Sequence, residues 1–308
     1  MSQELVTIIV PSYKRHSDLV ERAINSLLNQ TYKNIEVIVV DDNAKPGLES
    51  YREEISNLIA SIDDKRVVYV QNAENKGGAG SRNVAIAIAK GEYITFLDDD
   101  DEYLPLKVET QLEFMKANGL DMSFGKLNLY NEKDELVDVR EHDIKTFDKT
   151  FLRKYHLTKQ ITGTPTFMLK RELLQQVGGF EIVPMGQEYY LMQKILQTDC
   201  TMGYFPDCHI KAYRTAAEAI STGKGKITGE KALFKYKKSF FNILSFREKQ
   251  YVRCRHYAVM AVAYKRNKMY FKALCNLFVS VLCSPLTAVK EALGLQKRKK
   301  ETANEKTC

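Results

Sequence analysis

The most constraining stretch of this sequence is an apolar run that ends in four consecutive aspartates. Residues 93–97 read Tyr-Ile-Thr-Phe-Leu, a β-branched and aromatic run that predicts a buried strand. Residues 98–101 are all Asp. After Pro105 the apolar residues recur with helical spacing, at Leu106, Val108, Leu112 and Met115. This order predicts a strand, an acidic turn and a helix.

The acidic turn predicts a site for a cation. Four adjacent carboxylates repel one another, so folding would not gather them unless something positive lay among them. Ligands bind at the carboxyl ends of strands in open α/β sheets, and carboxylate oxygens favour Mg²⁺ or Mn²⁺ carrying a phosphate. Alternatively, acidic residues favour a helix start through capping and the helix dipole. That alternative accounts for Asp101 and Glu102, but not for three more aspartates beside the strand.

The first hundred residues predict alternating strands and helices. Apolar runs at 5–10, 35–40 and 67–70 read as strands. Between the first two, the apolar stripe over 19–28 predicts a helix, which Ser17 or Asp18 can cap. Strand, helix and strand with short joints make a βαβ unit.

A glycine cluster at 77–80, Gly-Gly-Ala-Gly, opens a further helix. It is a weak match to a dinucleotide fingerprint, because the third glycine is missing and the cluster follows the third strand rather than the first. We expect a tight turn that lets the helix start approach a ligand. A glycine turn without a ligand fits the pattern equally well.

Beyond Pro105 the alternation loosens. Strands are expected at 122–130 and 164–169, in a mixed sheet that completes the same domain. The loop 221–226 is expected to be mobile, and the pattern is helical from about Thr228 onward.

The C-terminal region leaves two readings open. Residues 270–289 are strongly apolar but are broken by Ser284-Pro285, so neither piece reaches the roughly 20 residues that span a bilayer. A basic cluster, Lys-Arg-Lys-Lys, follows at 297–300. Apolar helices with a basic cluster are typical of attachment to a membrane surface. A core helix pair with a solvated tail gives the same periodicity.

Composition narrows the class of protein. With 308 residues and 44% hydrophobic content, the chain reads as a soluble globular protein. Six scattered cysteines without metal-site spacing predict reduced thiols in a cytosol, and the polar residues 1–4 predict no secretory signal. The net charge of +7 favours anionic lipid or phosphorylated ligands. No nucleic-acid motif is visible, so nucleic acid is not an expected partner.

Four motifs in this order resemble the family 2 glycosyltransferases of the GT-A fold. They are Thr-Ile-Ile-Val-Pro-Ser-Tyr-Lys-Arg at 7–15, Val-Val-Asp-Asp-Asn at 39–43, Asn-Lys-Gly-Gly-Ala-Gly-Ser-Arg-Asn at 75–83 and Phe-Leu-Asp-Asp-Asp-Asp at 96–101. The resemblance covers roughly residues 5–225. It implies an α/β fold, a Rossmann-like mixed sheet flanked by helices, with a C-terminal helical extension. We expect a GT-A domain over 1–225, with a nucleotide-binding half at 1–100 and an acceptor half at 101–225, and a helical region over 226–308.

The resemblance implies roles for individual residues. Its first-strand loop would cradle the nucleotide base and ribose, and the residues in question are Pro11, Tyr13 and Arg15. The carboxylate that bonds uracil would be Asp42, and the basic residue near the base and diphosphate would be Arg82. The family's Asp-X-Asp motif matches Asp98, Asp99 and Asp100, with Asp100 as the expected metal ligand and Asp99 at the ribose or the metal.

Two positions depart from the family's pattern. The usual catalytic Asp in a Glu-Asp pair is replaced here by Glu188 in Gln187-Glu188. Glu188 shares a helical face with Leu191 and Ile195, and a carboxylate on an inward face is costly without a partner or a task. A first-turn Glu that faces water is the alternative. Many relatives also carry a His after Tyr-Arg, where residues 215–217 here read Thr-Ala-Ala, which puts a side-chain metal ligand from this loop in doubt.

The expected activity is inverting transfer of a sugar from a nucleotide diphosphate, most simply UDP, to a hydroxyl of a glycan or lipid-linked glycan, in cell-surface polysaccharide synthesis. Mn²⁺ or Mg²⁺ is the expected cofactor, and the enzyme is expected in the cytoplasm, at the inner face of the cell membrane. A nucleotidyltransferase of similar fold and an inactive protein that binds sugar nucleotides at a membrane surface are the alternatives. A dinucleotide-dependent dehydrogenase fits least, because of the incomplete glycine pattern at Gly78.

Overall fold

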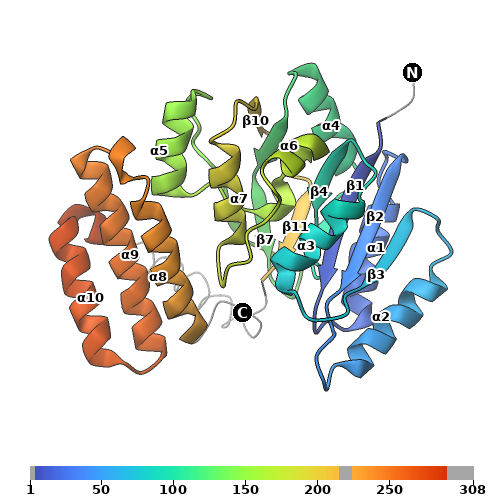
Figure 1. Ribbon diagram of the computed structural model, residues 1–308, viewed down its shortest axis with the longest axis horizontal. Coiled ribbons are helices and arrows are strands. Elements are labelled where there is room, and N and C mark those ends of the chain that lie inside the picture. The colour runs from blue at the N-terminus through green and yellow to red at the C-terminus, as the bar shows by residue number, and fades with distance from the viewer. Residues whose placement is uncertain (1–3, 215–223, 290–308) are drawn as a thin grey trace. The chain divides into compact units, whose positions relative to one another are not determined.

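A computed structural model describes residues 4–214 and 224–289 (Figure 1). The chain divides into two compact units, which we treat separately. Of the described residues, the N-terminal unit holds 4–152, 161–182 and 187–214, and the C-terminal unit holds 153–160, 183–186 and 224–289.

The N-terminal unit is built on a seven-stranded mixed sheet. Its strand order is β10-β6-β9-β4-β1-β2-β3. All neighbours are parallel except β9, which runs antiparallel to both β4 and β6. The strands are β1 (Val6–Ser12), β2 (Ile35–Asp41), β3 (Val67–Gln71), β4 (Tyr93–Phe96), β6 (Met122–Gly125), β9 (Met168–Lys170) and β10 (Met202–Phe205).

The central strands are mostly apolar because both faces of the sheet are covered. Ile8, Val10, Val37 and Val39 share one core with α1 (Ser17–Leu28), α2 (Glu49–Ser61) and α4 (Lys107–Ala117). Over β1 and β2, helix α3 (Gly77–Ile88) lies on the other face (Figure 1). The expected βαβ units and the mixed α/β fold are therefore confirmed.

A smaller four-stranded sheet adjoins the large one in the same unit, with the order β5-β11-β7-β8. The expected strand over 122–130 is in fact two strands, β6 in the large sheet and β7 (Leu127–Tyr130) in the small one. Gly125 ends β6 where an added Cβ would lie 2.9 Å from the Phe205 carbonyl oxygen, so only glycine fits this close approach. The remaining elements of this unit are β5 (Glu102–Tyr103), β8 (Leu136–Arg140), β11 (Ile210–Tyr213), the 3₁₀ turn Thr164–Thr166, α6 (Arg171–Gln176) and α7 (Gln187–Ile195). Helix α5 (Lys149–Lys159) begins in this unit, and its residues from 153 onward belong to the C-terminal unit.

The C-terminal unit is helical. Its main elements are α8 (Lys224–Lys238), the 3₁₀ turn Phe241–Ile243, α9 (Phe246–Arg266) and α10 (Tyr270–Cys283). Ser245 and Glu248 form a reciprocal capping box that fixes the start of α9. Within the described residues, no helix combines the length and the apolar character that crossing a bilayer requires.

Part of the expected mobile loop at 221–226 is helical instead. Residues 224–226 form the first turn of α8, while 221–223 lie outside the described residues. Two glycines made the segment look like a loop. Of these, Gly225 lies within the first turn of α8, so a glycine alone did not end the helix here.

Candidate active site

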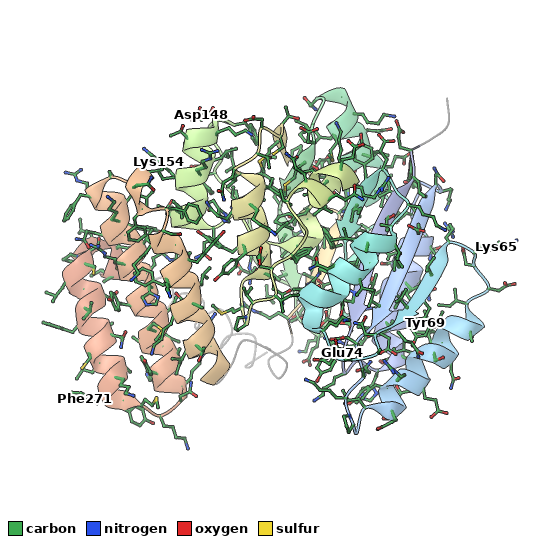
Figure 2. The ribbon with its side chains drawn as sticks, viewed as in Figure 1. Lys65, Tyr69, Glu74, Asp148, Lys154 and Phe271 are labelled. Atoms are coloured by element: carbon green, nitrogen blue, oxygen red, sulfur yellow. The ribbon has the colours of Figure 1, made fainter. Side chains whose placement is uncertain are left out.

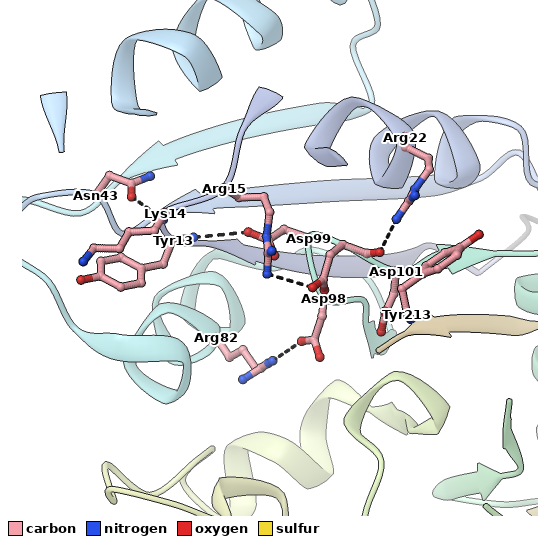
Figure 3. A network of polar contacts seen from close by, with 11 residues as sticks. Tyr13, Lys14, Arg15, Arg22, Asn43, Arg82, Asp98, Asp99, Asp101 and Tyr213 are labelled. Atoms are coloured by element: carbon pink, nitrogen blue, oxygen red, sulfur yellow. Dashed lines mark hydrogen bonds and ion pairs between the residues drawn. The ribbon is translucent and has the colours of Figure 1, made fainter. Parts of the chain in front are cut away.

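The carboxyl ends of three parallel strands bring together three of the four sequence motifs. β1 lies between β2 and β4, and their registers align Ser12 with Asp41 and Ile9 with Phe96. The loops that follow these strands therefore begin at one edge of the sheet, as expected for a ligand site in a parallel sheet. Figure 3 shows the polar contacts that join the loop after β1 to the loop after β4.

The four aspartates point alternately outward and inward. Asp98 and Asp100 are partly exposed, at 44% and 25% of their side chains, whereas Asp99 and Asp101 are buried. A backbone hydrogen bond from Asp101 to the Asp98 carbonyl closes a turn that spreads the carboxylates apart. The Asp98 and Asp100 carboxylates thus face outward, whereas those of Asp99 and Asp101 are buried within the protein.

Arg15 supplies the positive group that the acidic run requires. Its Nε lies 3.1 Å from Asp99 Oδ1, and its Nη2 lies 2.8 Å from Asp100 Oδ2. The Tyr13 backbone N–H donates to the other Asp99 oxygen at 3.3 Å. In the same loop Lys14 has a positive φ of 54°, and its N–H donates to Asn43 Oδ1 at 2.7 Å. The loop after β1 is therefore held against the aspartates and against the loop after β2.

Burial shifts the titration of both inward carboxyls. It raises the pKa of Asp99 to about 6, although the nearby Arg15 charge opposes the shift. Burial, followed by the charges of Asp98 and Asp100, raises the pKa of Asp101 well above its ordinary value. Asp101 accepts a hydrogen bond from the Tyr213 backbone N–H at 2.8 Å, which ties β11 to the acidic turn.

Arg82 joins the acidic turn to the start of α7. Its Nη2 pairs with Asp98 Oδ1 at 2.6 Å, and its Nη1 donates to Gln187 Oε1 at 3.3 Å (Figure 3 shows the first contact). Gly78 lies under this contact, because an added Cβ would sit 3.2 Å from Arg82 Nη1. Glu188, the next residue of α7, is half-buried, and within the described part of the chain no hydrogen bond or ion pair engages its carboxylate.

Asp42 binds four donors of its own chain. Its Oδ1 accepts from the Asn72 amide and the Lys76 N–H, and its Oδ2 accepts from the Asn75 amide and the Gly77 N–H, all at 2.7–2.8 Å. The side chain is almost fully buried. Asp42 thereby caps the start of α3 from across the sheet edge, satisfying N–H groups that a helix leaves without partners.

Tyr13 offers an aromatic ring between two ammonium groups. Lys14 and Lys45 each lie 5.5 Å from the ring centre. Pro11, at the end of β1, is half-buried opposite Val40 of β2. A hollow of about 450 Å³ lies beside this region, and none of the candidate site residues lines it; its walls are Asn43, Ala44, Lys45, Pro46, Glu49, Arg52, Glu53, Ser56, Asn57 and Gln71.

The outward carboxylates fit a divalent cation in their donor chemistry. Over residues 4–214 and 224–289, no three His, Cys, Asp or Glu side chains gather as a metal site. Mg²⁺, however, is commonly held by one or two carboxylates together with substrate phosphates, so Asp98 and Asp100 suffice as protein ligands. The segment 215–217, where the family resemblance led us to look for a His, lies outside the described residues.

A family model supports the resemblance found in the sequence. The model described as "Glycosyl transferase family 2" matches residues 7–178, more than half of the chain. The chain belongs to glycosyl transferase family 2.

Curated members of this family resemble the chain over different shares of its length. WfaP of Escherichia coli, named as a UDP-Glc:alpha-D-GlcNAc-diphosphoundecaprenol beta-1,3-glucosyltransferase, is 39% identical over 44% of this chain. The match spans about half, 49%, of WfaP itself. WfgD of E. coli, which carries the same enzyme name, is 30% identical over 73% of this chain and 83% of its own length. TuaG of Bacillus subtilis, a "putative teichuronic acid biosynthesis glycosyltransferase", is 30% identical over 76% of this chain and 87% of its own length.

Solved structures support the fold. A crystal structure of S. aureus TarS 1-349 in complex with UDP-GlcNAc superposes with a TM-score of 0.55 at 18% identity, covering 86% of this chain and 73% of that one. At that identity the match speaks for the fold, and it agrees with the GT-A architecture expected from the motifs.

Several residues of the site had no signal in the sequence. Arg22 of α1 donates from Nη2 to the Asp100 carbonyl at 2.5 Å (Figure 3), and the Tyr213 N–H reaches Asp101 from a separate sheet. Both contacts depend on how distant elements pack. The spacing of Arg22 on the outward side of an amphipathic helix gives no hint of its partner.

Proposed function

We propose that this family member is an inverting glycosyltransferase that moves a sugar from a nucleotide diphosphate, UDP in the first instance, to a hydroxyl of a lipid-linked glycan in cell-surface polysaccharide synthesis. One observation carries the proposal. Two outward carboxylates, Asp98 and Asp100, are each paired with an arginine at the ligand-binding edge of the sheet, and an unpaired Glu188 follows directly on Gln187, the partner of Arg82. The enzyme names of WfaP and WfgD support the donor and acceptor classes.

The donor would bind along the loops after β1 and β2. The base would lie against the Tyr13 ring near Pro11, with the neighbouring ammonium groups favouring a phosphorylated ligand. Arg15 and Arg82 would bind the diphosphate, since guanidinium groups suit phosphate oxygens. Asp42 would act on the base side of the site. All four of its hydrogen bonds are made within the chain, so its effect on the base would come mainly through the loop that it holds.

A divalent cation would be held by Asp100, the ligand expected from the sequence, together with Asp98. When bound it would supply Lewis-acid stabilisation of the diphosphate charge that builds as the anomeric C–O bond breaks. Asp99 would position the loop after β1, because it bonds both Arg15 and the Tyr13 N–H. A role of Asp99 at the ribose or the metal stays a prediction.

Glu188 would act as the catalytic base. Inversion needs a carboxylate that takes the acceptor proton while the acceptor oxygen attacks the anomeric carbon opposite the leaving group. Glu188 has no partner in the described chain, and the adjacent Gln187 holds the start of α7 next to the Arg82–Asp98 pair. Glu188 would therefore lie on the side of the site where the acceptor binds, opposite the leaving diphosphate.

The acceptor implies work at a membrane. A lipid-linked glycan is presented at a bilayer surface, so we propose that the enzyme acts at the cytoplasmic face of a membrane and touches it through the C-terminal region. The basic cluster at 297–300 lies outside the described residues.

The proposal is tested by separating donor binding from transfer. Glu188→Gln should lose transfer by about 10²-fold or more while binding UDP as the wild type does. Asp100→Asn should weaken Mn²⁺-dependent UDP binding and transfer together. The matched control is Glu172→Gln, which changes an exposed glutamate on α6 and should alter neither.

The assays are calorimetry of UDP with Mn²⁺ or with EDTA, and transfer or donor hydrolysis for each variant. Equal UDP affinity with and without metal would refute the metal claim. Wild-type turnover by Glu188→Gln would remove Glu188 from the mechanism. If the wild type binds donors tightly but neither hydrolyses nor transfers them, the result would instead support an inactive binding protein.

A further inference from the structure

Helix α10 carries a continuous apolar face that the described protein leaves uncovered. The side chains of Phe271, Leu274, Phe278 and Leu282 are exposed at 80%, 65%, 63% and 66% (Figure 2 labels Phe271). They recur at intervals of three and four residues, so they form one stripe along the helix. Tyr270, Leu277 and Val281 widen this stripe and are also exposed. We call these seven residues the outer face of α10.

Two polar residues of α10, Ser280 and Asn276, lie on the opposite side of the helix. Ser280 is fully buried and donates to the Cys254 carbonyl of α9 at 2.9 Å. Asn276, one turn earlier, lies on the same side of the helix and is partly covered. A helix on a water-facing surface normally buries its apolar side and exposes its polar side. The polarity of α10 is the reverse, which indicates that its outer face meets an apolar environment.

The charge around this helix is strongly positive. Residues 224–289 contain fourteen lysines and arginines but only two acidic residues, Glu230 and Glu248. Four of the cations, Lys265, Arg266, Lys268 and Lys272, are exposed at the turn between α9 and α10, beside the first residues of the outer face. An apolar stripe bordered by cations matches the interface of a bilayer that contains anionic lipid.

We propose that the outer face of α10 is the surface with which the protein docks onto an anionic lipid bilayer. The helix lies in the plane of the interface, with its aromatic and leucine side chains among the acyl chains and the α9–α10 turn at the headgroups. Its 14 residues extend about 21 Å at 1.5 Å per residue, less than the roughly 30 Å of a bilayer core. This inference rests on the membrane contact proposed above, but not on the reaction or on the roles of the site residues.

Two other occupants fit less well. Residues 290–308, which the structure does not describe, contain few large apolar side chains and a run of four cations, too little to cover seven exposed apolar residues. A second copy of the chain would bring its own cationic unit against this one, and such like-charge contact is unfavourable. Lipid headgroups supply the opposite charge.

The chain contains no tryptophan, so a single introduced tryptophan reports its own environment. In full-length Phe278→Trp, we expect the fluorescence to shift to the blue on addition of phosphatidylcholine–phosphatidylglycerol vesicles, and to be quenched by brominated acyl chains. Leu136→Trp is the matched control, since Leu136 is an exposed leucine on β8. Its fluorescence should change little. An unchanged signal from Phe278→Trp under conditions where the wild type binds vesicles would overturn the proposal.

A second measurement follows binding directly. Leu274→Gln/Phe278→Gln should lower the vesicle partition coefficient by about tenfold or more, because two exposed side chains no longer leave water on binding. Leu136→Gln should bind as the wild type does, and raised salt should weaken wild-type binding because screening reduces attraction to the headgroups.

The double variant should bind UDP normally, so a failure here is distinct from a failure of the proposed reaction. If the wild type binds neither anionic nor neutral vesicles, the proposal is wrong. It is equally wrong if the wild type sediments as an oligomer that the double variant dissociates while vesicle binding is unchanged. In that case a second copy covers the face.

Discussion

The buried carboxylate of Asp99 is expected to lower the stability of the folded protein while supporting donor binding. Its carboxyl is almost fully buried, and burial raises its pKa from an ordinary 3.8 to about 6. Because one pKa unit corresponds to 1.36 kcal/mol, carrying this charge at neutral pH costs the folded state about 3 kcal/mol. Asp99→Asn removes the charge. The amide can no longer accept from both Arg15 Nε and the Tyr13 N–H, and this loss offsets about 1 kcal/mol of the gain in stability. We expect a net stabilisation of about 2 kcal/mol at neutral pH.

The sign of the pH dependence follows from the raised pKa of Asp99. Between about pH 4 and pH 6 the folded state binds the proton more tightly than the unfolded state, so the contribution of Asp99 to stability falls as pH rises through this window. Above about pH 6 both states are ionised, and the penalty is full and constant. The advantage of Asp99→Asn should therefore be present near neutral pH and should shrink toward about pH 4.

Urea unfolding of both proteins at several pH values measures this difference directly. The control is Asp98→Asn, whose more exposed carboxylate should change stability by about 0–1 kcal/mol, the usual scale for a surface ion pair. A variant Asp99→Asn that is less stable than the wild type at neutral pH would refute the reasoning. So would a stability difference between the two that does not vary with pH. The variant should also bind donor more weakly, because Asp99 no longer holds Arg15 and the Tyr13 N–H in place in the loop after β1.

Two further predictions concern groups that the fold buries. Asp42→Asn cannot satisfy all four donors at the start of α3, so we expect a loss of about 2 kcal/mol and faster hydrogen exchange at the N–H groups of Lys76 and Gly77; unchanged exchange would contradict the capping role. Burial lowers the pKa of Lys107 well below its ordinary value, so the unfolded state binds the proton more tightly and wild-type stability rises with pH. Lys107→Met should therefore be more stable than the wild type near neutral pH in urea unfolding, with a gain that shrinks at alkaline pH; a gain that grows instead would contradict this.

The parallel half of the fold could be predicted because its signals are local. Strands β1, β2 and β4 are mostly apolar, and each ends at a motif that the family resemblance places at the donor. Their pairing follows from the βαβ rule, which leaves little choice of topology. The acidic turn was likewise recognisable, since four aspartates after a buried strand have few structural uses.

Contacts between distant elements could not be predicted in the same way. We expected Ser17 or Asp18 to cap α1, but the N-cap is His16, whose own side chain makes no capping hydrogen bond. The reason is tertiary: the Ser17 N–H meets the carboxylate of Glu54 on α2 at 3.4 Å. Nothing in the spacing along α1 reveals a partner 37 residues away. The four donors around Asp42 are hidden for the same reason.

The pairing of the outward carboxylates with arginines explains how the acidic turn can fold before any ligand arrives. Asp98 is neutralised by Arg82 and Asp100 by Arg15, so the repulsion within the turn is offset inside the protein. A cation bound at these carboxylates would release both guanidinium groups, and an incoming diphosphate is the partner that would take them. Binding of the cation and of the nucleotide should then be positively coupled. The cation frees the arginines to bind the diphosphate, and the diphosphate binds the arginines that the cation leaves without carboxylate partners. The metal should therefore raise the affinity for UDP, which is the quantity that the titration with Mn²⁺ and with EDTA measures.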